Sequence, residues 1–207
     1  VHVEHGIRGE ASRADAQFVA DLCVAYQIPL QTYEVDVPEY AKKKGIGLEE
    51  AARILRYDCY QKEVLRHGSA KGTVKVALAH HADDNAETFL FQMVRGSGLD
   101  GLSGMQPKRE FGERAQIIRP LLVVDRSQIE EYLGEIGQDY RTDETNFDTE
   151  YSRNRIRHDI LPQLQQINTA AVAHINQSAA RLRQVSEYLT VEVKKAGKQC
   201  CLATEEG

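Results

Sequence analysis

The stretch T-V-K-V-A-L-A-H-H-A-D-D-N-A-E-T at residues 73–88 decides the fold class of this chain. Its first half, Thr73 to Ala79, is a short apolar run rich in valine, which predicts a buried strand. Its second half predicts a helix from about Asp83 to Val94. A strand that leads directly into a helix is the building unit of a parallel sheet covered by helices.

The segments on the N-terminal side of this stretch repeat the alternation. Strands are predicted over residues 1–4 and 30–37, and each precedes a predicted helix, over residues 10–27 and 48–67. Gly68 is expected to cap the second helix. The order predicts an α/β fold, a Rossmann-like parallel twisted sheet with helices on both faces. Ligands of such sheets bind at the carboxyl ends of the strands.

The C-terminal half is predicted to be mainly helical. Four glycines between residues 96 and 104 forbid a helix there and favour a mobile loop. An extended piece and three helices follow, at residues 117–122, 125–136, 153–165 and after an N-cap at Asn168. The last helix is expected to turn five apolar residues inward: Ile175, Ala179, Leu182, Val185 and Leu189. We therefore expect a catalytic domain over residues 1–165 and a helical linker over residues 166–207.

Composition and charge exclude some classes of protein. No run of about 18 apolar residues is present, so neither a membrane span nor a signal peptide is predicted. The four cysteines form no C-x-x-C pair, which favours free thiols and a cytoplasmic location. The net charge of −5 argues against a basic nucleic-acid binder, so any RNA contact needs a local basic patch, and residues 153–158 supply one.

The polar residues after the strand at 73–79 carry the sharpest chemical signal. Asp84 and Glu87 are three positions apart and share a helix face. Two such carboxylates can bind or deprotonate an ammonium group, or hold Mg²⁺. His80 at the strand's end can donate a hydrogen bond to a phosphate. The structural alternative is that Asp83 caps the helix while Asp84 and Glu87 interact with the helix dipole.

Arginines at three places suit phosphate binding, because a guanidinium donates two parallel hydrogen bonds. Arg53 and Arg56 lie on the polar stripe of the helix predicted over 48–67, and Arg8 lies on a turn after the first strand. Arg153 and Arg157 are i,i+4 neighbours that can bind phosphates of RNA or ATP. For the stripe that carries Arg53 and Arg56, a Glu–Arg pair four positions apart on a solvated face is an equally good interpretation.

Six segments of this sequence occur together, in the same order, in tRNA(Ile)-lysidine synthetases, and the chain resembles that family. They are H-V-E-H-G-I-R-G-E at 2–10, G-L-E-E-A-A-R-I-L-R-Y at 47–57, A-H-H-A-D-D-N-A-E-T at 79–88, R-G-S-G-L-D-G-L-S-G-M at 95–105, I-R-P-L-L at 118–122 and Y-S-R-N-R-I-R at 151–157. The resemblance covers about residues 1–165. It implies the adenine-nucleotide α-hydrolase fold of the PP-loop ATPases.

The resemblance also implies a reaction. Such an enzyme uses ATP and Mg²⁺ to adenylate the C2 carbonyl of the wobble cytidine of tRNA(Ile), whose anticodon is CAU. The ε-amine of free lysine then displaces AMP and gives lysidine. His80, Asp84 and Glu87 fall on the family's functional positions, with Asp84 and Glu87 expected to bind and deprotonate lysine. The other expected contacts are Arg8, Arg53 and Arg56 to ATP phosphates, and Arg95, Arg153 and Arg157 to tRNA.

One departure from the family pattern concerns ATP. The family's S-G-G-x-D-S signature, whose backbone N–H groups cradle pyrophosphate, occurs nowhere in these 207 residues. In the family it precedes the strand that matches residues 1–4. We therefore expect the start of the catalytic domain and the family's C-terminal tRNA-recognition domains to lie outside this sequence, and the chain alone to be inactive.

Three other functions fit part of the sequence. A metal phosphoesterase could use His80, His81, Asp83 and Asp84 as ligands, but two-metal hydrolases need further clustered Asp and His residues, so we predict no metal site. A PP-loop tRNA thiolase generally needs the C-x-x-C pairs that this chain lacks. A non-catalytic RNA-binding module would bind tRNA in a salt-sensitive way and would tolerate replacement of Asp84.

Overall fold

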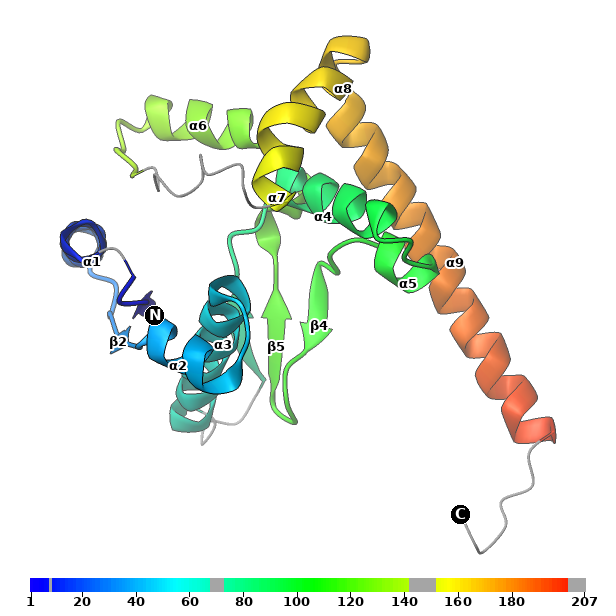
Figure 1. Cartoon of the computed structure of the whole chain (residues 1–207), viewed down its shortest axis with the longest axis horizontal. Helices are drawn as coiled ribbons and strands as arrows, with labels where there is room; N and C mark the ends of the chain where they lie inside the picture. The colour runs from blue at the N-terminus through cyan, green and yellow to red at the C-terminus, as the bar shows by residue number, and fades with distance from the viewer. Residues whose placement is uncertain (8, 68–72, 142–151, 201–207) are drawn as a thin grey trace, which may run out of the picture. The chain divides into compact units, whose positions relative to one another are not determined.

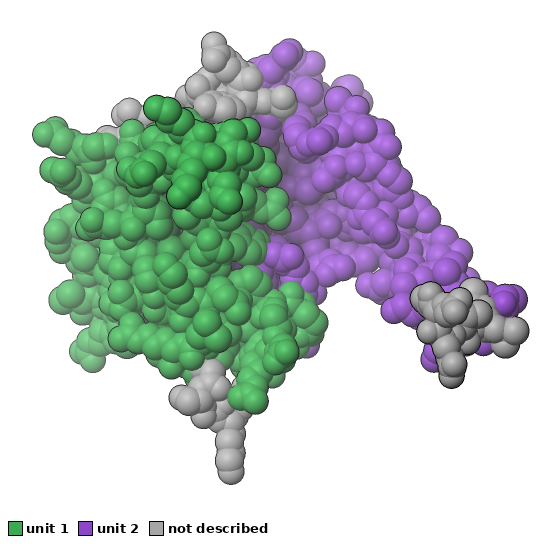
Figure 2. Space-filling model, turned by 60° about the horizontal axis from the view of Figure 1, so that its bottom comes forward, with its two compact units in different colours: residues 1–76, 110–116 green, residues 77–109, 117–207 purple. Residues whose placement is uncertain are grey.

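The structure is a computed structural model, which describes residues 1–7, 9–67, 73–141 and 152–200 (Figure 1). The chain forms two compact units (Figure 2). Unit 1 comprises residues 1–76 and 110–116, and unit 2 comprises residues 77–109 and 117–207. Gly68, which was expected to cap a helix, lies outside the described residues, as do Arg8 and Tyr151.

Unit 1 contains a parallel strand pair and three helices. β1 and β2 run side by side, with His2 opposite Thr32. The core of the helical part is formed by Val37, Ala41 and Ala51, which are buried together. The elements are β1 (His2–Glu4), α1 (Glu10–Ala25), β2 (Thr32–Glu34), α2 (Val37–Lys44) and α3 (Leu48–His67).

Helix α2 was not predicted, and the strand expected over residues 30–37 is wrong at its end. The strand stops at Glu34 because Asp36 begins a helix instead. The Asp36 side chain accepts a hydrogen bond from the Glu39 backbone N–H at 2.8 Å. Gly45 then ends the helix in the left-handed region, with φ of 66°. Local capping chemistry therefore overrides the apolar alternation that had indicated a longer strand.

A second sheet has three strands in the order β3-β5-β4. The Val74 N–H donates to the Arg114 carbonyl and the Leu78 N–H to the Ile118 carbonyl, so the bonds advance together along both strands and the pair is parallel. β4 and β5 are joined by a short connection and are antiparallel. The strands are β3 (Val74–Ala77), β4 (Lys108–Glu110) and β5 (Ala115–Ile118). The α/β class with parallel pairing and covering helices is therefore confirmed, with β4 as an antiparallel addition.

The prediction that residues 73–79 form a fully buried strand is wrong. β3 is the outer strand of the order β3-β5-β4, and its side chains alternate between partly buried and exposed. Lys75 and Ala77 are the exposed positions.

Unit 2 is mainly helical, as expected. Its core cluster consists of Ala82, Ala86 and Leu90 from one helix, packed on Ile156, Leu161 and Val172. The helices are α4 (Ala82–Val94), α5 (Leu99–Leu102), the 3₁₀ turn η1 (Pro120–Val123), α6 (Arg126–Glu135), α7 (Ser152–Arg155), the π-helical turn η3 (Ile156–Ile160), α8 (Leu161–Ile167) and α9 (Ala171–Cys200). None of the helices in the described ranges is long and apolar enough to cross a bilayer.

In unit 2, two predicted helix caps agree with the structure, whereas the helix-free stretch predicted around residues 96–104 does not. Asp125 caps α6 by accepting the Gln128 N–H at 2.9 Å. The Asn168 side chain accepts the Ala170 N–H at 2.9 Å, one residue before α9. The glycine-rich stretch was expected to exclude a helix, yet α5 forms within it, because only one of its four residues is glycine.

Helix α9 is the longest element and packs on α4, α5 and α8. Ala179 is fully buried and Ile175 packs against the unit 2 core, as predicted. Val185 and Leu189 are 47% and 43% exposed, so the inward orientation predicted for Val185 is wrong, whereas Leu189 lines a cavity between α5 and α9. The apolar stripe of α9 is thus longer than the surface of unit 2 that covers it. The division into a catalytic domain and a linker after residue 165 stays a prediction.

Candidate functional site

The site is built around the start of α4. Helix α4 begins at Ala82, whose N–H donates to the Val124 carbonyl at 2.8 Å. His81 occupies the N-cap position, and its backbone N–H donates to Asp84 Oδ2 at 3.0 Å. Asp83 does not cap α4. Its carboxylate instead accepts the Arg126 N–H at 2.9 Å, at the start of α6. The capping alternative for Asp83 is therefore wrong for this helix, because the helix starts one residue earlier than predicted.

Asp84, Glu87, Arg153 and Arg157 form a compact group that we call the acid–arginine cluster. Arg157 donates from Nε to Glu87 Oε1 at 2.6 Å and from Nη2 to Glu87 Oε2 at 3.0 Å. The same Nη2 donates to Asp84 Oδ1 at 3.0 Å. Arg153 adds a contact from Nε to Glu87 Oε2 at 3.2 Å. Two of the six segments quoted above therefore meet in this cluster, 79–88 on α4 and 151–157 on α7 with its π turn.

Glu87 is the buried centre of this cluster, with only 1% of its surface exposed. Burying an isolated carboxylate is costly, but two guanidinium groups compensate its charge and satisfy its lone pairs. The pKa of Arg157 reflects the same balance between burial and charge pairing. Burial lowers its pKa, whereas the hydrogen bond and charge of Glu87 raise it, and the result is a raised pKa. The π turn η3 places Arg157 while the neighbouring Ile156 enters the core.

His81 lies between two carboxylates at the edge of the cluster. Its Nδ1 is 3.3 Å from Asp83 Oδ2, and its Nε2 is 3.5 Å from Asp84 Oδ2. The contact with Asp83 raises the pKa of His81, against the opposing effect of burial. The contact with His81 lowers the pKa of Asp83, and the Arg126 N–H lowers it further. His81 lies within the motif at residues 79–88, but no role in the ligase mechanism was predicted for it.

His80 also has a partner that the sequence analysis missed. The Arg119 guanidinium donates from Nε to His80 Nδ1 at 3.3 Å and from Nη1 to the Gln106 carbonyl at 2.7 Å. Arg119 belongs to the I-R-P-L-L segment, and an arginine within an apolar run that must be buried was the available signal.

The remaining predicted site residues lie in different places. Arg53 and Arg56 are exposed on α3 of unit 1, with the Arg53 guanidinium 5.6 Å from the centre of the Tyr57 ring. Arg95 is exposed at the end of α4, where it stacks on Phe91 at 5.2 Å. Arg153 and Arg157 were expected to contact tRNA. In the structure they form ion pairs with the acids that were expected to bind lysine.

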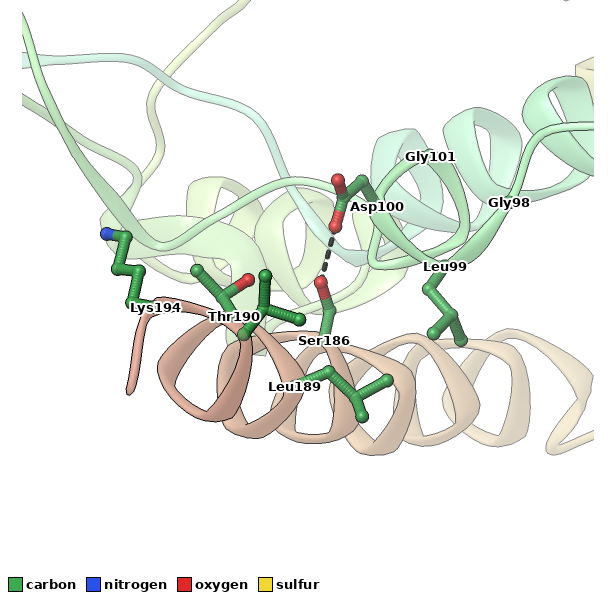
Figure 3. A pocket seen from close by; sticks show the side chains of 9 residues that line it. Gly98, Leu99, Asp100, Gly101, Ser186, Leu189, Thr190 and Lys194 are labelled. Carbon is green, nitrogen blue, oxygen red and sulfur yellow. Dashed lines mark hydrogen bonds between the residues drawn. The ribbon is translucent and has the colours of Figure 1, made fainter. Parts of the chain in front are cut away.

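A cavity of about 590 Å³ lies elsewhere in unit 2, between α5 and α9 (Figure 3). Its polar contact is a hydrogen bond from the Ser186 hydroxyl to the Asp100 carboxylate. Leu99, Leu189 and Val193 give it a largely apolar lining. None of the predicted catalytic residues lines it, so it is separate from the acid–arginine cluster.

The described residues offer no metal-binding set. Across the described ranges, no group of three or more His, Cys, Asp or Glu side chains is placed to hold a metal ion. In this part of the chain, His80, His81, Asp83 and Asp84, the ligands that the phosphoesterase alternative requires, do not form such a group. Cys23, Cys59 and Cys200 are free thiols on α1, α3 and α9, far apart in the chain.

Comparison with known proteins gives a consistent picture. Residues 1–164 match the model of the PP-loop domain family. A tRNA(Ile)-lysidine synthase of Bacteroides thetaiotaomicron is 37% identical over 206 residues, which is 100% of this chain and 46% of that protein. The synthase of Bacillus subtilis is 40% identical over 189 residues, covering 91% of this chain and 38% of the relative. That of Thermotoga sp. strain RQ2 is 46% identical over 167 residues, with 81% and 38% covered.

The chain spans less than half the length of each of these relatives. Among solved structures, the U34-tRNA thiolase NcsA from Methanococcus maripaludis, with its [4Fe-4S] cluster, aligns with a TM-score of 0.65. It covers 87% of this chain and 59% of the thiolase at 15% identity, so the likeness concerns the fold alone.

Proposed function

This chain belongs to the PP-loop domain family, and from that premise we propose that it carries the lysine-transfer site of a tRNA(Ile)-lysidine synthetase. Membership of this family implies the use of ATP. The proposed reaction adenylates the C2 carbonyl of the wobble cytidine of tRNA(Ile), whose anticodon is CAU, and then joins free lysine to that carbon. The names of the curated relatives support this reaction over the alternatives.

The observation that carries the proposal is the acid–arginine cluster, which offers both charge signs within one small group. Free lysine has an ε-ammonium, an α-ammonium and an α-carboxylate. Asp84 is partly exposed and suits an ammonium, whereas a guanidinium suits a carboxylate through paired hydrogen bonds. A site for lysine needs both kinds of group, and the ends of α4 and α7 supply them.

The two acids have different roles in this proposal. Glu87 is almost fully buried and saturated by two arginines, so we assign it the role of holding Arg153 and Arg157 in place. Asp84 is bound by a single nitrogen of Arg157, and its side chain remains partly exposed. We therefore assign it the role of binding the ε-ammonium of lysine and of accepting a proton from it before the amine attacks. His80 donates a hydrogen bond to phosphate oxygens during adenylation.

Magnesium is expected to accompany ATP, and the described residues contain no group of three or more His, Cys, Asp or Glu side chains placed to hold a metal ion. In this proposal Mg²⁺ would be bound mainly by the phosphates of the nucleotide, as is usual for this ion. No step of the proposed chemistry assigned to this chain depends on a protein ligand to the metal.

The proposed partner is tRNA(Ile), which we place in the cytoplasm with the enzyme. Arg95 is the exposed member of the three arginines expected to contact it, whereas Arg153 and Arg157 are engaged with acids. Arg53 and Arg56 are exposed on unit 1 and remain the candidates for ATP phosphates, together with Arg8. A chain with net charge −5 needs such local cations to approach RNA.

Lysine binding can be tested on the 207-residue chain itself. Heteronuclear NMR titration with lysine is expected to shift amide resonances at the start of α4, whereas norleucine, which lacks the ε-amine, leaves them unchanged. Asp84→Asn is expected to abolish the lysine response. Glu130→Gln, an exposed carboxylate on α6, serves as the matched control and keeps it. Equal responses to lysine and norleucine would contradict the proposal.

Transfer can be tested by placing this chain in the Bacillus subtilis relative in exchange for its matching segment. The chimera is expected to attach radiolabelled lysine to a tRNA(Ile) transcript when ATP is present, and Asp84→Asn is expected to lose this activity. Sulfur incorporation instead of lysine would favour the thiolase. A chimera that binds ATP and tRNA but transfers no lysine would sink the ligase assignment.

A further inference from the structure

Arg119 is a buried arginine outside the acid–arginine cluster, and one of its donors meets an imidazole ring. Only 9% of its surface is exposed. It lies just beyond β5 and donates one hydrogen bond to a backbone carbonyl, that of Gln106, and another to an imidazole nitrogen, Nδ1 of His80.

We propose that Arg119 is a positioning residue that fixes the tautomer of His80 with its proton on Nε2. A guanidinium is permanently charged and has donors but no acceptor. The nitrogen that receives its Nε–H must therefore present a lone pair, so Nδ1 carries no proton. In a neutral imidazole the proton then resides on Nε2, and Arg119 converts an ambiguous ring into a hydrogen-bond donor of fixed direction.

The use of this donor rests on the proposed function. If His80 serves an adenylation step, its Nε2–H is the atom that can reach an anionic phosphate oxygen. The opposite tautomer would direct a lone pair toward that oxygen and repel it. Arg119 also adds a positive charge next to the ring, which favours an anionic ligand on the imidazole's other side.

The segment that Arg119 touches is held independently by other side chains, so Arg119 is not its sole support. Arg183 of α9 donates to the Ser103 carbonyl and, at 2.8 Å, to the Met105 carbonyl. Asn85 of α4 accepts the Met105 N–H through its Oδ1. Residues 103–106 therefore keep two anchors if Arg119 is replaced. This arrangement supplies the control that separates a positioning role from a structural one.

The test reads the tautomer directly. The chain is prepared with ¹⁵N-labelled histidine, and long-range ¹H–¹⁵N correlation spectra at neutral pH distinguish protonated from unprotonated ring nitrogens. The spectrum of His80→Gln assigns the His80 signals among the seven histidines. We expect unprotonated Nδ1 and protonated Nε2 in the wild type. In Arg119→Met, which keeps an unbranched apolar stem but has no donor, we expect loss of the single tautomer.

Arg183→Met is the matched control, because it removes donors from the same segment without touching His80. It is expected to lower the melting temperature while leaving the His80 tautomer unchanged. An unchanged tautomer in Arg119→Met, or an equal change in Arg183→Met, overturns the inference. If Arg119→Met does not fold, the wild-type spectrum still decides, since a proton on Nδ1 contradicts the proposal by itself.

The measurement needs neither lysine nor tRNA, so it separates this inference from the proposed function. A fixed tautomer that depends on Arg119, together with no lysine transfer by the chimera, would keep the inference and reject the ligase. Lysine transfer with a mixed tautomer in the wild type would keep the ligase and reject the role of Arg119.

Discussion

Single residues show how strongly the charges of the candidate site depend on one another. Glu87→Gln removes the charge that holds Arg153 and Arg157, and leaves both guanidinium groups beside a neutral amide. We expect a loss of about 3 kcal/mol in the free energy of unfolding, the lower end of the range for a broken buried ion pair, because both arginines are partly exposed. Urea denaturation followed by circular dichroism measures it.

The control for Glu87 is another carboxylate paired with arginine. Glu130 contacts Arg126 at 2.7 Å, but the two side chains are 39% and 48% exposed. Glu130→Gln is therefore expected to cost about 0.5 kcal/mol. Similar losses in the free energy of unfolding for both variants would show that burial does not strengthen the ion pairs of Glu87.

His81 makes a pH-dependent contribution to stability. Its pKa is raised above the ordinary value of 6.5, so its contribution is fully present below that pH and is lost as pH rises through the higher folded-state pKa. Asp83 has a lowered pKa, so its contribution is lost only as pH falls below its ordinary 3.8. The stability difference between wild type and His81→Gln is expected to be larger at about pH 5.5 than at about pH 8.5. A constant difference between these pH values would contradict the raised pKa.

At the scale of elements, the contact between α4 and the segment after α5 depends on Gly104. Its φ of 64° lies in the left-handed region, and an added Cβ would be 2.5 Å from Asn85 Oδ1. Gly104→Ala is expected to cost at least about 1–2 kcal/mol from the backbone alone. Gly134 on α6 has open space, so Gly134→Ala is expected to stabilise the protein by about 0.5 kcal/mol. Thermal unfolding of both variants checks the opposite signs.

The packing of α9 provides a second comparison at this scale. Ala179 is fully buried, whereas Ala196 is exposed on the same helix. Ala179→Leu is expected to destabilise the protein by about 1–3 kcal/mol through overpacking. Ala196→Leu is expected to stay within about 0.5 kcal/mol of the wild type. Equal unfolding midpoints in guanidinium chloride would show that α9 does not depend on this contact.

At the scale of the whole molecule, the sequence predicted the α/β class, because predicted strands alternate with the helices predicted over 10–27, 48–67 and 83–94. It also identified the acids of α4. It did not predict that Arg153 and Arg157 bind those acids, since the partners are far apart in the chain and periodicity carries no information on such distant pairs. The exposure of Lys75 on β3 was missed for the same reason, as it depends on the order of strands.

ATP binding is a property of the whole chain that the sequence does address. The S-G-G-x-D-S signature, whose backbone N–H groups would bind the phosphates, does not occur in the 207 residues. We therefore expect isothermal titration of this chain with ATP to give a dissociation constant weaker than the micromolar range. Micromolar binding would show that other groups, such as Arg53 and Arg56, suffice.

The π turn at Ile156–Ile160 interrupts the regular α-helical winding of the segment that carries Arg157. Ile156 and Leu161 both enter the unit 2 core. Five positions along a regular α-helix of 3.6 residues per turn would separate them by about 140° around the axis. The wider winding of the π turn reduces this angle, so that both side chains can face the core. Removing one residue from this turn would restore ordinary winding and leave Ile156 and Leu161 four positions apart, about 40° around the axis, so α8 would keep its apolar face on the core while Arg157 would lose the extra residue that places it.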